Sequence, residues 1–249
     1  MERGMLESNC KMAFTMVPLG NNVIVTEKID TANVNAGIKD AVTAASTFGF
    51  DVYDGNTNKG HYNLGDGGIA TETKCVTGDY VHVVQTHPQT VLTYTTNYDI
   101  YNTANKTETK QSGTTTTSAN IRLLNPSGDN YDFAEVEADY VNTPAVGSVS
   151  VTKVVNGGTG DDPTREFNGT VTVSLDGGSS YKAYPLTYKT SDDPSRTYTL
   201  TNSGALISGA KLKNGRTLTF SGLPSGASFC RTGDCISPRL CLHRGGWSG

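Results

Sequence analysis

The stretch 147–155, GSVSVTKVV, constrains the fold of this chain more than any other part of it. Valine recurs there with a two-residue period, at Val149, Val151 and Val155, which is the pattern of a β-strand with one buried face. Lys153 falls on the same face, where a lysine is costly unless its charge is neutralised or consumed. The alternative is an edge-strand lysine, whose charge opposes aggregation. The stretch therefore predicts a strand whose lysine either faces a core or guards an edge.

The composition agrees with many short strands around thin cores. Only 35% of the residues are hydrophobic and 28 are glycine, which suits turns, while the frequent threonines suit pleated surfaces. A length of 249 residues permits two modules of about 100 residues each, the usual size of a β-sandwich. The net charge is −4 and no basic stripe is visible, which argues against nucleic-acid binding.

The two ends of the sequence carry no targeting signal. No apolar run approaches the roughly eighteen residues that a membrane-spanning helix needs. The first twenty residues lack the hydrophobic region of a signal peptide, and no sorting signal or hydrophobic tail closes the chain. We interpret the chain as an internal fragment of a longer gene product, with a cytoplasmic protein as the competing interpretation.

Three motifs follow one another in the second half of the chain. They are VSVTK at 149–153, EF at 166–167 before a strand-like TVTVSL, and LKNGRTLTFSGLPSGASF at 212–229. Together they resemble the isopeptide-linkage modules of streptococcal pilins and related Gram-positive surface adhesins, and the third motif is the most specific. The resemblance covers residues 148–229. It implies that a first-strand lysine is joined to a last-strand asparagine by an intramolecular amide bond, with help from a buried carboxylic acid.

The resemblance also implies roles for individual residues. Lys153 matches the first-strand lysine, and we expect it to point between two sheets beside Phe167 and Val171. A weak partial copy of the module lies upstream, and in it Glu27 matches the acid that assists amide formation. Burial would keep that acid protonated and the amine neutral, which are the states that amide formation requires. The alternative for Glu27 is a surface glutamate at a strand end.

Two asparagines compete for the closing position of the first module. Asn142 lies in phase with an apolar strand face and stands shortly before the VSVTK motif, whereas Asn97 lies on a face with two threonines. Asn142 is favoured, although the long gap from Glu27 would require a large insertion. If Asn97 closes the module instead, residues 98–147 become a linker or an added hairpin.

Neither copy contains a complete set of lysine, acid and asparagine. The first copy lacks a VSVTK strand, and Lys11 is the only lysine ahead of it. The second copy loses the pattern after Phe229. We therefore predict that Lys153, Asn142 and Glu27 are not bonded to one another and that the chain contains no isopeptide bond.

The motifs divide the chain into three parts. Residues 1–146 form an atypical or partial sandwich module, residues 147–229 the isopeptide-linkage-like module, and residues 230–249 a divergent tail that we expect to be disordered. The fold class is all-β: tandem immunoglobulin-like β-sandwich modules, the second truncated at its C-terminal strands.

Coarser elements of the first module follow from hydrophobic periodicity. Strands are expected at 81–84, 91–101 and 133–142, and a short helix within 31–50. The polar stretch 102–120 is interpreted as an exposed loop or linker.

No metal or cofactor site is predicted. Cys230, Cys235, Cys241 and His243 are zinc-type ligands, but their spacing is not that of a familiar zinc site, and a reading-frame change explains this tail better. The acidic pairs at 161–162 and 192–193 are interpreted as solvated turns rather than calcium ligands.

The predicted function is that of a structural stalk segment of a bacterial surface adhesin or pilus-like protein, located at the cell wall. Its partners would be adjacent modules of the same protein, and a host or glycan ligand. Scattered histidines and the absence of a nucleophile motif argue against an enzyme. The alternative is a secreted carbohydrate- or ligand-binding module whose stacking rings would be Tyr53, Tyr62, Tyr80 and Tyr94.

Overall fold

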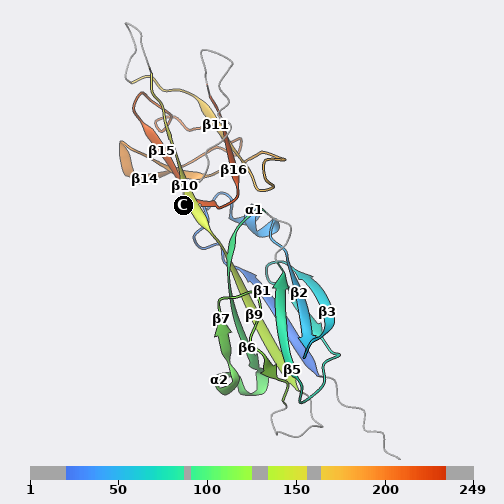
Figure 1. Ribbon diagram of the computed structural model, residues 1–249. Helices are drawn as coiled ribbons and strands as arrows, with labels where there is room; N and C mark the ends of the chain where they lie inside the picture. Colours follow the sequence, from blue (N-terminus) through green and yellow to red (C-terminus); the bar gives the residue numbers. More distant parts are fainter. Residues whose placement is uncertain (1–20, 87–90, 125–133, 156–163, 234–249) are drawn as a thin grey trace, which may run out of the picture.

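A computed structural model describes residues 21–86, 91–124, 134–155 and 164–233 of the chain. It contains two β-sandwiches stacked end to end, with the short helix α1 (Lys39–Ala44) between them (Figure 1). The all-β fold class is confirmed, because the described helices are short and the strands form four sheets.

The first sandwich packs a five-stranded sheet on a four-stranded one. The first sheet has the order β4 (Ile69–Glu72), β1 (Asn22–Ile29), β9 (Glu135–Pro144), β6 (Tyr94–Asn102) and β7 (Gln111–Gly113). The second has the order β3 (Thr57–Leu64), β2 (Phe48–Asp54), β5 (Tyr80–Thr86) and β8 (Ile121–Arg122). Strands β1 and β9 run parallel over eight residues, which brings the beginning and the end of the module together.

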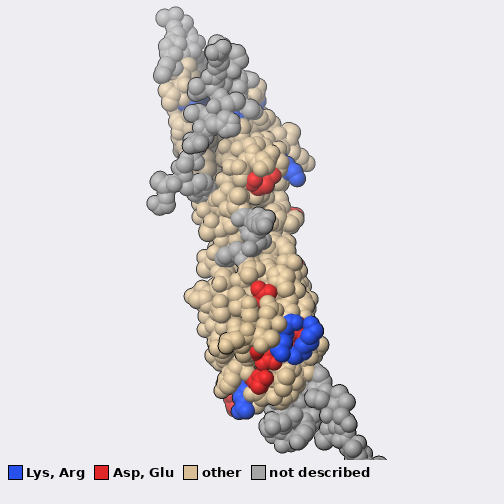
Figure 2. All heavy atoms as spheres, turned by 45° about the vertical axis from the view of Figure 1, so that its right-hand side comes forward, with Lys and Arg blue, Asp and Glu red and all other residues tan. Residues whose placement is uncertain are grey.

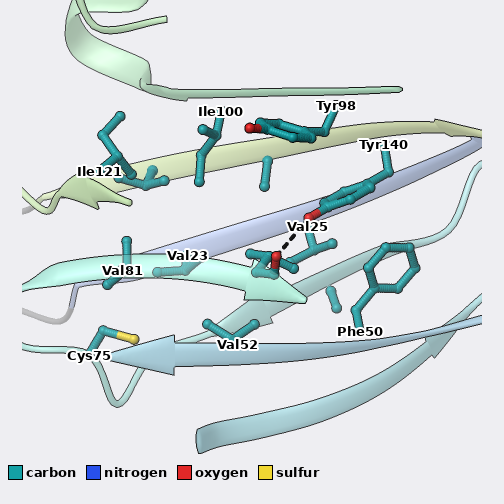
Figure 3. Close-up of a cluster of buried hydrophobic side chains, with 14 of the residues drawn as sticks. Val23, Val25, Phe50, Val52, Cys75, Val81, Tyr98, Ile100, Ile121 and Tyr140 are labelled. Atoms are coloured by element: carbon teal, nitrogen blue, oxygen red, sulfur yellow. Dashed lines mark hydrogen bonds between the residues drawn. The ribbon is translucent and has the colours of Figure 1, made fainter. Parts of the chain in front are cut away.

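The core of the first sandwich forms where the apolar faces of its two sheets meet. Alternate residues of β1, β2, β5 and β9 are buried, as the two-residue period of a half-buried strand requires. Tyr140 lies at the centre, packs edge-on against Phe50 and donates a hydrogen bond to the carbonyl of Val83 at 2.8 Å (Figure 3). Its hydroxyl is thereby satisfied inside an otherwise apolar layer.

The second sandwich is built from a four-stranded and a three-stranded sheet. The first has the order β10 (Val146–Thr152), β15 (Thr217–Pro224), β13 (Thr187–Thr190) and β14 (Asp193–Thr199). The other has the order β12 (Lys182–Ala183), β11 (Gly169–Ser174) and β16 (Ser228–Gly233). Strand β10 pairs with β15 alone within the described part of the chain, so it lacks the parallel partner that β9 gives to β1.

The polar stretch 102–120, interpreted as an exposed loop or linker, is mostly exposed, but it belongs to the first sandwich and does not link two modules. It contains the 3₁₀ helix η1 (Thr103–Asn105), the helix α2 (Lys106–Thr109) and strand β7, which pairs with β6. Farther on, the carbonyl of Thr116 accepts a hydrogen bond from the Gln85 amide, and the Ser118 amide donates one to Val83. Backbone hydrogen bonds hold this stretch, and they do not depend on apolar side chains.

The end of the second module also differs from the expectation. The pattern does not stop at Phe229, because β16 continues through Gly233 and pairs with β11. The remainder of the predicted tail, with Cys235, Cys241 and His243, lies outside the described residues.

Candidate functional site

The candidate site lies in the first sandwich, where Glu27 of β1 meets Asn142 of β9. Both side chains face the core, with 2% and 0% of their surface exposed. The Asn142 carboxamide nitrogen lies 3.0 Å from one carboxyl oxygen of Glu27 and 2.9 Å from the other. Parallel pairing of β1 with β9 brings the two residues together, and the long stretch of sequence between them forms the other strands of the first sandwich.

The Asn142 carboxamide is held at both of its polar atoms. The Thr96 hydroxyl donates a hydrogen bond to the carboxamide oxygen at 2.7 Å, while the carboxamide nitrogen faces Glu27. Because each atom has a partner of the matching kind, the amide has one preferred orientation. The site is thus a buried carboxylic acid hydrogen-bonded to a carboxamide whose orientation is fixed.

Burial sets the protonation of the acid. Loss of solvent raises the pKa of Glu27 from 4.5 to about 8; the hydrogen bond from Asn142 opposes this rise and the nearby Asp66 carboxylate adds to it. The carboxyl group is therefore protonated at neutral pH. A neutral acid beside a carboxamide can polarise it toward attack by an amine, which is the chemistry that the resemblance implies.

Of the two competing asparagines, the structure brings Asn142 to Glu27. Asn97 lies on the exposed face of β6, which it shares with Thr95. The face assigned to Asn142 from its apolar neighbours is confirmed, because Val136, Ala138 and Tyr140 are buried with it.

Lys153 belongs to the second sandwich and its contacts lie there. Its amine nitrogen lies 4.7 Å from the centre of the Phe167 ring, and its backbone bridges to Asn214. The predicted strand phase is confirmed, since Val149 and Val151 pack against the second core. Among the described residues, no interaction joins Lys153 to Glu27 or Asn142.

The first described strand of the first sandwich carries an acid rather than a lysine at this site. The resemblance implies a lysine on the first strand next to the asparagine strand, and β1 presents Glu27 to Asn142 instead. Lys11 lies outside the described residues. Within the described part, the contact between first and last strand is thus a hydrogen-bonded pair.

A further polar residue, Gln85, faces this core, and its burial was not expected from the sequence. It alternates with the buried Val81 and Val83 on β5, and neither atom of its carboxamide has a hydrogen-bond partner in the described structure. The Tyr140 hydroxyl bonds the Val83 carbonyl, and β5 and β9 both run toward the second sandwich (Figure 1). Gln85 follows Val83 by two residues on β5, and Asn142 follows Tyr140 by two residues on β9. Both side chains therefore lie at the same end of the core. The alternation Val81, Val83, Gln85 was the signal in the sequence.

Of the four tyrosines of the alternative function, Tyr80 is the most exposed, at 57%, and the other three are partly buried. Tyr94 is partly buried, packs edge-on against Phe48, and its hydroxyl bonds that of Ser46. Tyr62 donates a hydrogen bond to Glu72, whereas Tyr53 stacks on a histidine of β5.

Of the two acidic pairs interpreted as solvated turns, the structure describes only the second. The first pair, at 161–162, lies outside the described residues. In the second, Asp192 binds Arg216 and Asp193 accepts hydrogen bonds from Ser195 and Tyr198. In the part of the chain that the structure describes, no group of three or more histidine, cysteine, aspartate or glutamate side chains could hold a metal ion.

The described surface and helices add two observations. Figure 2 shows acidic and basic side chains in small groups, and most of the face it presents carries neither. None of the described helices has the length and apolar character to cross a membrane.

Comparison with known proteins gives one family match and several distant structural neighbours. Residues 147–230 match a family model described as a domain of unknown function, DUF7601. No curated protein matches the chain. The major pilin from Streptococcus pyogenes has 16% sequence identity and a TM-score of 0.47, with 87% of this chain and 83% of the pilin covered.

Two further structures complete the comparison. The T3.2 major pilin of the same species has 14% identity and a TM-score of 0.45, over 85% of this chain and 81% of that one. The fimbrial anchor protein Mfa2 from Porphyromonas gingivalis has 10% identity and a TM-score of 0.27, over 86% and 78%. The match to DUF7601 lies within the second sandwich, from β10 into β16.

Proposed function

We propose that this chain is a structural segment of an extended bacterial surface polymer, a pilus-like or adhesin stalk. The observation that carries the proposal is the continuity between its modules: β9 ends at Pro144 and β10 begins at Val146, so the last strand of one sandwich leads directly into the first strand of the next. A chain joined in this way passes tension from module to module along its backbone. The resemblance of residues 148–229 to pilin modules supports the same role.

The Glu27–Asn142 pair has a structural role in this proposal. The two residues connect β1 with β9, the strands at the two ends of the first sandwich, and a force applied along the chain acts on those strands. The hydrogen-bonded pair takes the place that an amide cross-link has in the modules that the chain resembles. We propose no catalytic activity, and the partners are adjacent modules or subunits of the same polymer at the cell wall.

Electron microscopy of intact producing cells tests the proposal. Gold-labelled antibodies raised against the folded chain should mark extended structures outside the cell wall in repeated rows, and unpermeabilised cells of a deletion strain should stay unlabelled. Labelling restricted to the cell interior, or protein found free in the medium with none on the wall, would contradict the proposal. A glycan array provides a second test, because a saturable glycan ligand would favour the binding-module alternative.

A further inference from the structure

A segment of the first module completes the core of the second. Val34, Ile38 and Val42, from the connection between β1 and β2, are each at most 4% exposed. They belong to the hydrophobic cluster of the second sandwich, together with Leu186 and Leu223. The segment 31–46, which includes α1, lies between the two sandwiches (Figure 1). Its apolar side chains therefore stabilise the second sandwich and not the one from which they branch.

Asn35 fixes this segment by bonding to the backbone of two strands. Its carboxamide nitrogen donates to the carbonyls of Thr187, at 2.8 Å, and Ser221, at 2.9 Å, and its oxygen accepts from the Thr187 amide at 2.9 Å. Strands β13 and β15 pair at Lys189 and Thr219, so Thr187 and Ser221 would form the next pair of that ladder. The carboxamide of Asn35 lies between them and takes the place of a peptide group. Every polar atom of this side chain, which is 5% exposed, is thus used.

The backbones of the two modules also touch where glycine removes a side chain. A Cβ at Gly37 would lie 2.0 Å from the Pro185 carbonyl oxygen, and one at Gly226 would lie 1.9 Å from that of Val91. Gly222 has a φ of +72° and would place a Cβ 2.7 Å from the Asn35 amide nitrogen. Glycine at these positions lets the backbones of the two modules pack directly against each other.

We infer that the segment 31–46 is a plug that closes the second sandwich, so that the two sandwiches fold and unfold as one cooperative unit. Without the plug, Leu186 and Leu223 would lose apolar cover at that end of the core, and the carbonyls of Thr187 and Ser221 would lose their buried partner. The second sandwich thus depends on residues more than a hundred positions upstream. The inference concerns folding alone, and it can fail or hold independently of the proposed function.

The test compares Asn35→Ala with Asn33→Ala in the full chain. Asn33 is exposed and lies two residues away, so its variant controls for the change of residue type. Calorimetry of the unmodified chain should give one unfolding transition. Asn35→Ala should lower its midpoint by about 5–15 °C, because several buried backbone groups lose partners, whereas the control should shift it by about 2 °C or less.

Hydrogen exchange with mass spectrometry gives the decisive readout. In Asn35→Ala, the slowest-exchanging peptides of both sandwiches should exchange faster by the same factor, about tenfold or more, because both open in one global event. Faster exchange in only one sandwich, no change in the second sandwich, or two separate calorimetric transitions would overturn the inference. If Asn35→Ala does not fold, Ile38→Val gives the same test with a midpoint shift of about 2–4 °C, and both sandwiches should again respond equally.

Discussion

Replacing Glu27 with glutamine should abolish a specific part of the pH dependence of stability. The folded chain holds this carboxyl at a pKa of about 8, against 4.5 in water, because it is buried. Between these two values the unfolded chain loses the proton while the folded chain keeps it. Unfolding then releases a proton. The contribution of Glu27 to the free energy of unfolding is therefore greatest below pH 4.5, falls as the pH rises through this window, and levels off above pH 8.

The size of the effect follows from the two pKa values. The slope approaches 1.4 kcal/mol per pH unit in the middle of the window and is smaller near its ends, so the Glu27 contribution falls by about 2.5 kcal/mol from pH 5 to pH 7. For a chain of this size, that loss lowers the unfolding midpoint by about 5–10 °C. Exposure of Glu27 is only 2%, so solvent screening removes little of this effect. Glutamine has nearly the same shape, keeps one acceptor oxygen for the Asn142 carboxamide nitrogen, and carries no proton that titrates in this range.

Thermal unfolding followed by circular dichroism at pH 5, 6, 7 and 8 measures the difference directly. The midpoint of Glu27→Gln minus that of the unmodified chain should rise steadily from pH 5 to pH 8. Glu108→Gln, a substitution of the same type at an exposed position of α2, should give a difference that stays near zero. A Glu27→Gln difference that is constant across this range would refute the reasoning, since the buried acid would then not be protonated in the folded chain.

Three other predictions concern polar side chains and the predicted lack of a cross-link. Asn142→Ala should lower the free energy of unfolding in urea by about 2–4 kcal/mol, because the buried Glu27 carboxyl and Thr96 hydroxyl lose their partner. The control Asn97→Ala, at an exposed position, should change it by no more than about 0.5 kcal/mol. The intact mass of the purified chain should equal the mass of its sequence; a value lower by one ammonia that is restored in Lys153→Ala would show a bond that we predict to be absent. Arg216→Ala should cost about 1–3 kcal/mol in the same urea assay, because Arg216 is buried and donates to the carbonyls of Gly209 and Lys211. Arg216→Lys should recover little of this stability, since lysine lacks the planar guanidinium group. Full recovery by lysine would contradict this explanation.

The sequence predicted strand faces better than strand partners. The two-residue period placed Glu27 on the face of Val23 and Val25, and Asn142 in phase with an apolar face, and the structure buries both residues. Their meeting depends on the parallel pairing of β1 with β9, two strands at opposite ends of the module. A local pattern contains no information on such a long-range pair, so the gap in sequence looked like an argument against Asn142.

Two other features escaped prediction for different physical reasons. The helix expected within 31–50 exists as α1, and Ile38 and Val42 are buried, but periodicity does not tell which of two cores a helix covers. The stretch 102–120 was assigned to a linker because its side chains are polar. Its contacts with β5 and β6 run through backbone groups, which any sequence possesses.

Forced unfolding of single molecules held at the two chain ends tests the central claim most directly. The claim is that this chain is a mechanical segment whose two sandwiches are interlocked and contain no covalent cross-link. It predicts one dominant force peak. The gain in length at that peak should equal the extended length of residues 21–233, roughly 70 nm, minus the length of the folded protein. Two peaks of about half that length would show independent modules, a markedly shorter total would show a closed covalent loop, and extension without a force peak would contradict the structural role.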